Sequence, residues 1–146
     1  MQTTGARLPI IVLALALGAC DAKWKYEQER SERAATTYPP NYKTEILDYM
    51  RSYLNDPTRV RDAYVSEPTL RNLDGRSRYS VCIRYNARNA EGRYLGSRDS
   101  LVTFRDGRLD HLIDSRLDRG AGPDPAREQC RDAAYQRFPE LERLTR

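Results

Sequence analysis

The chain has 146 residues, a formal net charge of +4, three cysteines and a single histidine. Its length allows one folded domain at most once a leader is removed. One histidine, and no cysteine pair at C-x₂₋₄-C spacing, exclude the usual tetrahedral zinc site, so neither a metal nor a cofactor is expected.

The first nineteen residues have the three parts of an export signal. Arg7 supplies the positive charge, Leu8 to Leu17 form the apolar stretch, and Gly18 and Ala19 precede the expected cut. The twelve residues from Leu8 to Ala19 fall short of the about 20 that a helix needs to cross ~30 Å of hydrocarbon. A transmembrane anchor is therefore not expected.

The sequence Leu17-Gly18-Ala19-Cys20 resembles the lipobox of bacterial lipoproteins. This resemblance implies that residues 1–19 are removed and that Cys20 becomes the lipidated first residue, with diacylglycerol on its sulfur and further acylation such as palmitate. Two or three acyl chains anchor a protein stably, whereas one does not. The alternative is a soluble leader cleaved after Ala19.

The lipobox also implies a location in the cell envelope, facing the periplasm. Asp21 stands where enterobacterial lipoproteins carry a signal for retention in the inner membrane, but that rule varies between bacterial groups. The choice between inner and outer membrane therefore stays open.

Residues 20–40 are expected to be the lipidated cysteine and a flexible tether. From Asp21 to Pro40 there are four cations, four anions and no aliphatic pattern. A short helix from Lys25 to Ala35 would have no core face to bury. A coil of this length would span roughly 25 Å.

A globular domain is predicted over residues 41–146, beginning with a helix of about three turns. Its cap is Asn41 or Thr44, and Pro57 ends it because proline disfavours helical geometry in the preceding residue. One apolar stripe runs along it, made of Ile46, Leu47, Met50, Tyr53 and Leu54.

After Pro57 the apolar period changes from 3.6 to 2, which predicts strands. Asp106-Gly107 is a two-residue hairpin turn, so Phe104 is expected opposite Leu109 and Val102 opposite His111, on the buried face. The predicted strands are 60–66, 79–86, 94–105 and 108–114.

A second helix is predicted from Pro125 to Phe138, with Asp124 as its cap. The resulting fold class is α+β: a helix, a four-stranded antiparallel meander and a helix, after an N-terminal signal and tether.

Cys82 and Cys130 remain once Cys20 is lipidated, and an oxidising envelope favours a disulfide between them. Cys82 lies on the opposite face of its strand from Val81 and Ile83. The sheet is then covered on both faces, or a bulge redirects Cys82, or the second helix wraps an edge. The small apolar residues of the second helix favour covering.

No known catalytic motif is present in the sequence, so an enzyme is not expected. His111 is the one candidate general base, and its expected place opposite Val102 is typical of a half-buried, hydrogen-bonded histidine. The alternative is a small envelope enzyme or inhibitor with a site at His111.

Arginines outnumber lysines by 22 to three, and their guanidinium forks suit carboxylates and phosphates. From Arg59 to Arg108 there are eleven cations and six anions, net +5, whereas the flanking segments 41–58 and 109–146 are each net −1. The alternative reading is a solvated surface in a protein from a GC-rich genome. The candidate anion-binding residues are Arg84, Arg88, Arg93 and Arg98.

The domain looks like small lipoproteins of alphaproteobacteria, through the run Tyr38-Pro39-Pro40-Asn41-Tyr42-Lys43, the Val81-Cys82 strand and the Phe104-Arg105-Asp106-Gly107 turn. That resemblance implies an envelope location and assigns no activity. The expected role is a non-enzymatic interaction domain. Its partners would be membrane lipid through Cys20 and an envelope protein, peptidoglycan or anionic lipid, with no nucleic acid.

Overall fold

The computed structural model describes residues 10–116 and 122–145, and it describes side chains from Asp21 onward. It divides the chain into two compact units, residues 1–33 and 34–146. Residues 1–9 of the predicted export signal, and the side chain of Cys20, lie outside the described part. Among the described residues, no helix is both long and apolar enough to cross a membrane.

Helix α1 (Ile10–Ala35) includes residues 21–35, which were expected to be coil. Good helix formers fill this stretch, and pairs four residues apart support it: Arg33 with Glu29 at 3.3 Å and Gln28 with Glu32 at 3.4 Å. The expectation was wrong because it required a buried face, whereas propensity and such pairs also favour a polar helix.

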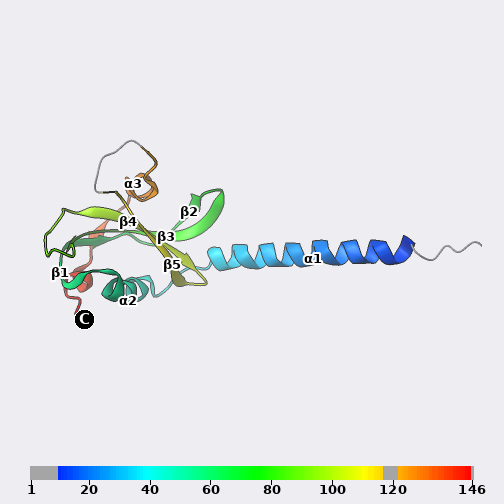
Figure 1. Cartoon of the computed structure of the whole chain (residues 1–146), viewed down its shortest axis with the longest axis horizontal. Helices are drawn as coiled ribbons and strands as arrows, with labels where there is room; N and C mark the ends of the chain where they lie inside the picture. Colours follow the sequence, from blue (N-terminus) through cyan, green and yellow to red (C-terminus); the bar gives the residue numbers. More distant parts are fainter. Residues whose placement is uncertain (1–9, 117–121, 146) are drawn as a thin grey trace, which may run out of the picture. The chain divides into compact units, whose positions relative to one another are not determined.

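The second unit combines helices with an antiparallel sheet, as the sequence predicted (Figure 1). The strand order is β5-β4-β3-β1-β6, and β2 pairs with β3 alongside this path. Its elements are α2 (Tyr42–Tyr53), β1 (Asp56–Val65), β2 (Thr69–Leu73), β3 (Arg76–Arg88), β4 (Arg98–Arg105), β5 (Arg108–Asp114), α3 (Pro125–Cys130), β6 (Gln136–Arg137) and α4 (Pro139–Glu142).

Helix α2 agrees closely with the predicted first helix. It buries Tyr42, Ile46 and Met50 against the sheet, and Asn41 stands at its N-cap without a capping side-chain hydrogen bond. At the other end the Leu54 N–H donates to the Met50 carbonyl at 3.1 Å. The apolar stripe thus predicted both the helix and the face that it buries.

The sheet has six strands rather than the predicted four. The prediction missed β2 because its residues are exposed or half-buried and show no apolar alternation. β1 and β2 both pair with the long strand β3, so the order is not a simple meander. β4 begins at Arg98 rather than Tyr94, and Tyr94 makes only an isolated bridge to Arg88.

A bulge in the β4–β5 hairpin changes the predicted register. Phe104 pairs with Leu109 as expected, but Asp110 is an extra residue, and His111 then pairs with Thr103 instead of Val102. Since strand side chains alternate, a shift of one residue moves His111 to the other face. Its side chain is 69% exposed, so the expected half-buried position was wrong.

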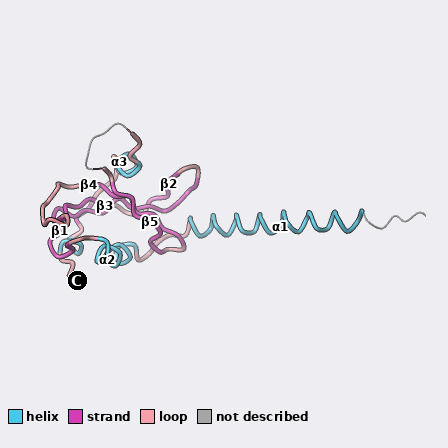
Figure 2. The backbone as a smooth tube through the Cα atoms, viewed as in Figure 1, coloured by secondary structure: helices cyan, strands magenta, loops and turns pink. Residues whose placement is uncertain are grey.

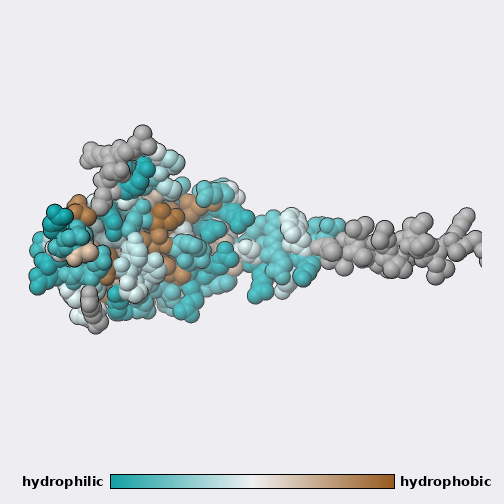
Figure 3. Space-filling model, viewed as in Figure 1, coloured by the Kyte–Doolittle hydropathy of each residue, from teal (hydrophilic) through white to brown (hydrophobic). Residues whose placement is uncertain are grey.

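Both faces of the sheet are covered (Figures 1 and 2), with α2 on one side and α3 on the other. Val81 and Ile83 join the larger core with α2 and α4, whereas Cys82 joins a smaller cluster with Ala126 and Cys130 of α3. The surface seen in Figure 3 is mostly hydrophilic, with a narrow apolar strip near its middle. Of the three predicted alternatives, two-sided covering is the one observed.

The predicted disulfide is present between Cys82 and Cys130, whose Cα atoms lie 5.6 Å apart. Its helix, α3, starts as predicted: the Asp124 carboxylate accepts from the Arg127 N–H at 3.1 Å, and Pro125 opens the first turn. The helix ends at Cys130, however, and not at Phe138.

The chain leaves α3 early because Phe138 belongs to the core on the opposite face of the sheet. A straight helix on the α3 side could not deliver it there. Instead β6 pairs with the edge of β1, where Arg137 lies opposite Tyr64, and α4 then packs on the α2 side. The chain itself, rather than the helix, wraps the edge.

Replacing Cys82 and Cys130 together by alanine is expected to lower the free energy of unfolding by about 4 kcal/mol, since the bond closes a loop with a sequence separation of 48. Urea unfolding of the variant and of the reduced wild type would measure the loss. A change below about 1 kcal/mol in both would contradict the role given to this bond.

Candidate functional site

Two adjoining hollows lie at the end of the sheet where β3 stops and β4 starts. The first, of about 290 Å³, is bounded by the end of α2, the end of β3, the loop before β4 and Asp114. The second, of about 450 Å³, is bounded by the start of β4, residues 115–116 and α3. Leu95 and Arg98 line both. We call the two hollows together the arginine cleft.

Asp114 organises the wall of the first hollow. Its carboxylate accepts hydrogen bonds from the hydroxyls of Tyr53 at 2.6 Å, Tyr85 at 3.2 Å and Ser100. Arg98 pairs with the same carboxylate at 3.0 Å and donates to the Tyr85 hydroxyl at 3.3 Å. This network fixes the Arg98 guanidinium between the two hollows.

Burial raises the pKa of the Tyr85 hydroxyl to about 12, and the charge of Asp114 adds to the effect. Burial and the bond to Asp114 also raise the pKa of Tyr53. Both phenols therefore remain protonated donors at any physiological pH.

Arg88 is the least satisfied cation of the first hollow. Its Nη1 lies 3.9 Å from the Asp56 carboxylate, beyond hydrogen-bond distance, and its guanidinium lies over the Tyr94 ring at 5.1 Å. Its Nε is buried and has no hydrogen-bond partner among the described residues. The side chain is 25% exposed, so an acceptor bound in the hollow could meet its outer Nη groups, which Asp56 does not hold by a hydrogen bond.

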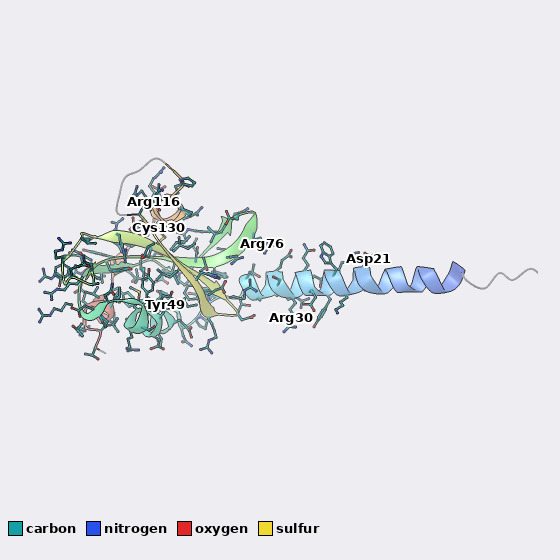
Figure 4. All side chains as sticks on the ribbon, in the orientation of Figure 1. Asp21, Arg30, Tyr49, Arg76, Arg116 and Cys130 are labelled. Atoms are coloured by element: carbon teal, nitrogen blue, oxygen red, sulfur yellow. A yellow bond between two sulfur atoms is a disulfide. The ribbon has the colours of Figure 1, made fainter. Side chains whose placement is uncertain are left out.

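Arg116 and Arg127 line the second hollow, held by Asp124. The Asp124 carboxylate accepts from the backbone N–H of Arg116 at 3.0 Å and of Arg127 at 3.1 Å. The Arg127 side chain donates to the Arg116 carbonyl at 2.7 Å. Arg116 and Cys130 lie on the same side of the sheet, opposite Tyr49 of α2 (Figure 4). The disulfide at Cys130 joins α3 to the sheet and so attaches Arg127, together with Arg116 to which it is hydrogen-bonded.

The structure brings together only two of the four candidate anion-binding arginines. Arg88 and Arg98 line the cleft. Arg84 instead makes a two-pronged pair with Asp99 at 2.8 and 3.2 Å, and Arg93 is exposed on the loop without lining either hollow.

Sequence reasoning missed the other two cleft arginines, Arg116 and Arg127. They lie in a segment whose net charge is −1, so counting charge along the chain gave them no weight. The N-cap motif at Asp124-Pro125 was the one usable signal, because it orders both of their backbones.

The positive charge of segment 59–108 is largely compensated by folding. At least six of its eleven cations pair with carboxylates, most of which come from outside the segment. Several arginines also lie over tyrosine rings, for example Arg84 over Tyr135 at 4.5 Å and Arg61 over Tyr94 at 4.3 Å. Each arginine named in these pairs and stacks therefore has a partner within the fold.

His111 lies outside the arginine cleft. Its Nδ1 is 3.1 Å from a carboxylate oxygen of Asp110, which also faces Arg78 at 3.4 Å and Arg105 at 3.9 Å. Within the described part of the chain, no cluster of histidine, cysteine and carboxylate side chains could hold a metal ion. The arginine cleft is the better candidate site because it is hollow and carries several convergent polar groups.

By class, the second unit is a mixed α+β domain with an antiparallel sheet, a disulfide and an arginine-lined cleft at one end of the sheet. Comparison with protein-family models, curated proteins and solved structures found no match to this chain.

The raised pKa of Tyr85 predicts a pH dependence of stability. Because the folded state favours the protonated phenol, its contribution is complete below pH 10 and is lost as the pH rises toward 12. A pKa raised from 10 to about 12 corresponds to about 3 kcal/mol in the free energy of unfolding. Denaturant unfolding across this range should show a flatter decline for Tyr85→Phe than for wild type. Tyr26→Phe, which removes an exposed tyrosine, is the control, and equal slopes in all three would refute the assignment.

Proposed function

We propose that the protein is a membrane-anchored lipoprotein of the cell envelope whose folded unit is a non-enzymatic binding domain. The observation that carries this proposal is the lining of the arginine cleft, which contains four arginines and two aspartates. Such a lining suits carboxylate or phosphate groups, because guanidinium forks match the geometry of both.

The anchor is supported by the sequence around Cys20, which has the order and position of a lipobox. The disulfide between Cys82 and Cys130 is consistent with this location, since such bonds persist in oxidising compartments outside the cytosol. An acylated Cys20 would hold the domain at a membrane facing the periplasm.

The chemistry of the cleft favours holding a ligand over converting it. Asp114 is paired with Arg98, and Asp99 with Arg84, so both lining carboxylates are engaged as acceptors. A general base needs a carboxylate or imidazole free to take a proton from substrate. The cleft instead offers N–H and O–H donors, which fits an anionic envelope component such as peptidoglycan, an anionic lipid or an acidic protein surface.

Anchoring is tested by labelling cells with radioactive palmitate and by mass spectrometry of the mature N-terminus. We expect label on the wild type, a mature chain that begins at an acylated Cys20, and release of Cys20→Ala into the soluble fraction. Cys82→Ala is the matched control and should remain labelled. An unlabelled wild type with an intact leader would contradict the anchor.

Binding at the cleft is tested with a photo-crosslinking amino acid placed in intact cells. Ser97 lines the second hollow, whereas Arg76 lies at the opposite end of β3. We expect an adduct from position 97 and none from position 76. Equal adducts at both positions, or none at 97 in a protein present at normal abundance, would count against a binding site in the cleft.

A further inference from the structure

We infer that the ligand of the arginine cleft is an acidic saccharide, a sugar chain bearing carboxylates that contacts both hollows across Leu95 and Arg98. This inference rests on the proposed function and names the ligand class for the same site. It follows from three properties of the cleft: compensated charge, a polar lining with the fixed ring of Tyr53, and the loosely held guanidinium of Arg88.

Carboxylates close to the cleft arginines neutralise much of their positive charge. Asp56 lies 3.9 Å from Arg88 and Asp124 lies 3.6 Å from Arg127, in addition to the carboxylates within the lining. A membrane surface or a dense polyanion attracts proteins through net positive charge, which is small here. Recognition in this cleft therefore depends on directed hydrogen bonds, and it suits a ligand with a few carboxylates among many neutral polar groups.

The lining provides partners for those neutral groups. Asn89 lines the first hollow and Ser97 the second, and amide and hydroxyl side chains can exchange hydrogen bonds with sugar hydroxyls. The Asn89 Oδ1 also accepts from the Arg93 N–H at 2.9 Å. Leu95 and Tyr53 are the large apolar side chains of the lining that are exposed, at 51% and 40%. So little apolar surface does not accommodate an acyl chain.

Tyr53 offers a fixed aromatic face beside these polar groups. Its hydroxyl is held by Asp114 at 2.6 Å, and its ring stacks on Tyr49 at 5.3 Å between centroids. A phenol ring presents an apolar face with a polar edge, which matches the mixed faces of a sugar ring. The ring is already ordered, so binding costs little further side-chain entropy.

Arg88 supplies the carboxylate contact in the first hollow. Its buried Nε has no acceptor among the described residues, and its Nη1 is too far from Asp56 for a hydrogen bond. The Nε is enclosed by the protein, so a ligand carboxylate would meet the outer Nη groups of this partly exposed guanidinium. Charge-assisted bonds of this kind are about twice as strong as neutral ones.

The test is isothermal titration calorimetry with the full chain in nonionic detergent and a hexamer of galacturonic acid as the probe. The methyl ester of the same hexamer keeps its size and hydroxyls but removes the charge. We expect the ester, and the variant Arg88→Gln, each to weaken binding about tenfold or more. Arg76→Gln removes the same charge from the other end of β3, roughly 40 Å away along the strand, and should bind as wild type does.

A second variant, Ser97→Glu, guards against a folding defect in Arg88→Gln, because Ser97 is exposed and a carboxylate there would repel the probe. Equal affinity for hexamer and ester, or unchanged binding by both variants, would overturn the inference. So would binding to inorganic phosphate or to vesicles containing phosphatidylglycerol without binding to the hexamer. These last results would leave the anchored binding domain standing, because palmitate labelling and the crosslink from position 97 test it separately.

Discussion

The fold depends on burial of the central strand β3 on both of its faces. Val81 and Ile83 point into the core under α2 and α4, while Cys82 points the other way and is joined to Cys130. A short helix such as α3, with six residues, is not stable by itself in water. Its attachment at Cys130 therefore positions the arginines beside it, and the second hollow depends on that bond.

Two-sided burial also explains the path of the C-terminal segment. The smaller core under α3 contains few large side chains, whereas Phe138 and Leu141 are fully buried in the larger one. The chain must cross the β1 edge to place them, and β6 pairs with β1 during that crossing. The same crossing covers part of a strand edge that would otherwise be open to pairing.

The sequence predicted those parts of the fold that depend on local pattern. Helix α2, the β4–β5 turn and the start of α3 all follow from apolar spacing, a turn dipeptide and a capping residue, and all three are present. The bulge at Asp110 has no local signal, because Asp110 is fixed by contacts with Arg78 and Arg105 from other strands. The end of α3 was missed for a similar reason, since the larger core on the far face determines where Phe138 lies.

Only two of the four arginines that line the cleft could be predicted from the sequence. Arg88 and Arg98 lie close to one another in the charged stretch that the sequence singled out, but a count of charges along the chain cannot show which carboxylates will face them. Arg84 pairs with Asp99 and does not line the cleft. Arg127 does line it, although it belongs to a segment whose net charge is negative.

The position of the cleft has a general cause. Within the sheet, the ladder satisfies the backbone groups and neighbouring strands occupy the space beside each side chain. Between the end of β3 at Arg88 and the start of β4 at Arg98 the ladder is interrupted, and side chains there lack a strand on one side. Arg88 stands at this end with its Nη1 3.9 Å from the Asp56 carboxylate, beyond hydrogen-bond distance, and with a quarter of its side chain exposed. The same interruption that ends the sheet thus creates the space beside the Arg88 guanidinium that the proposed binding site uses.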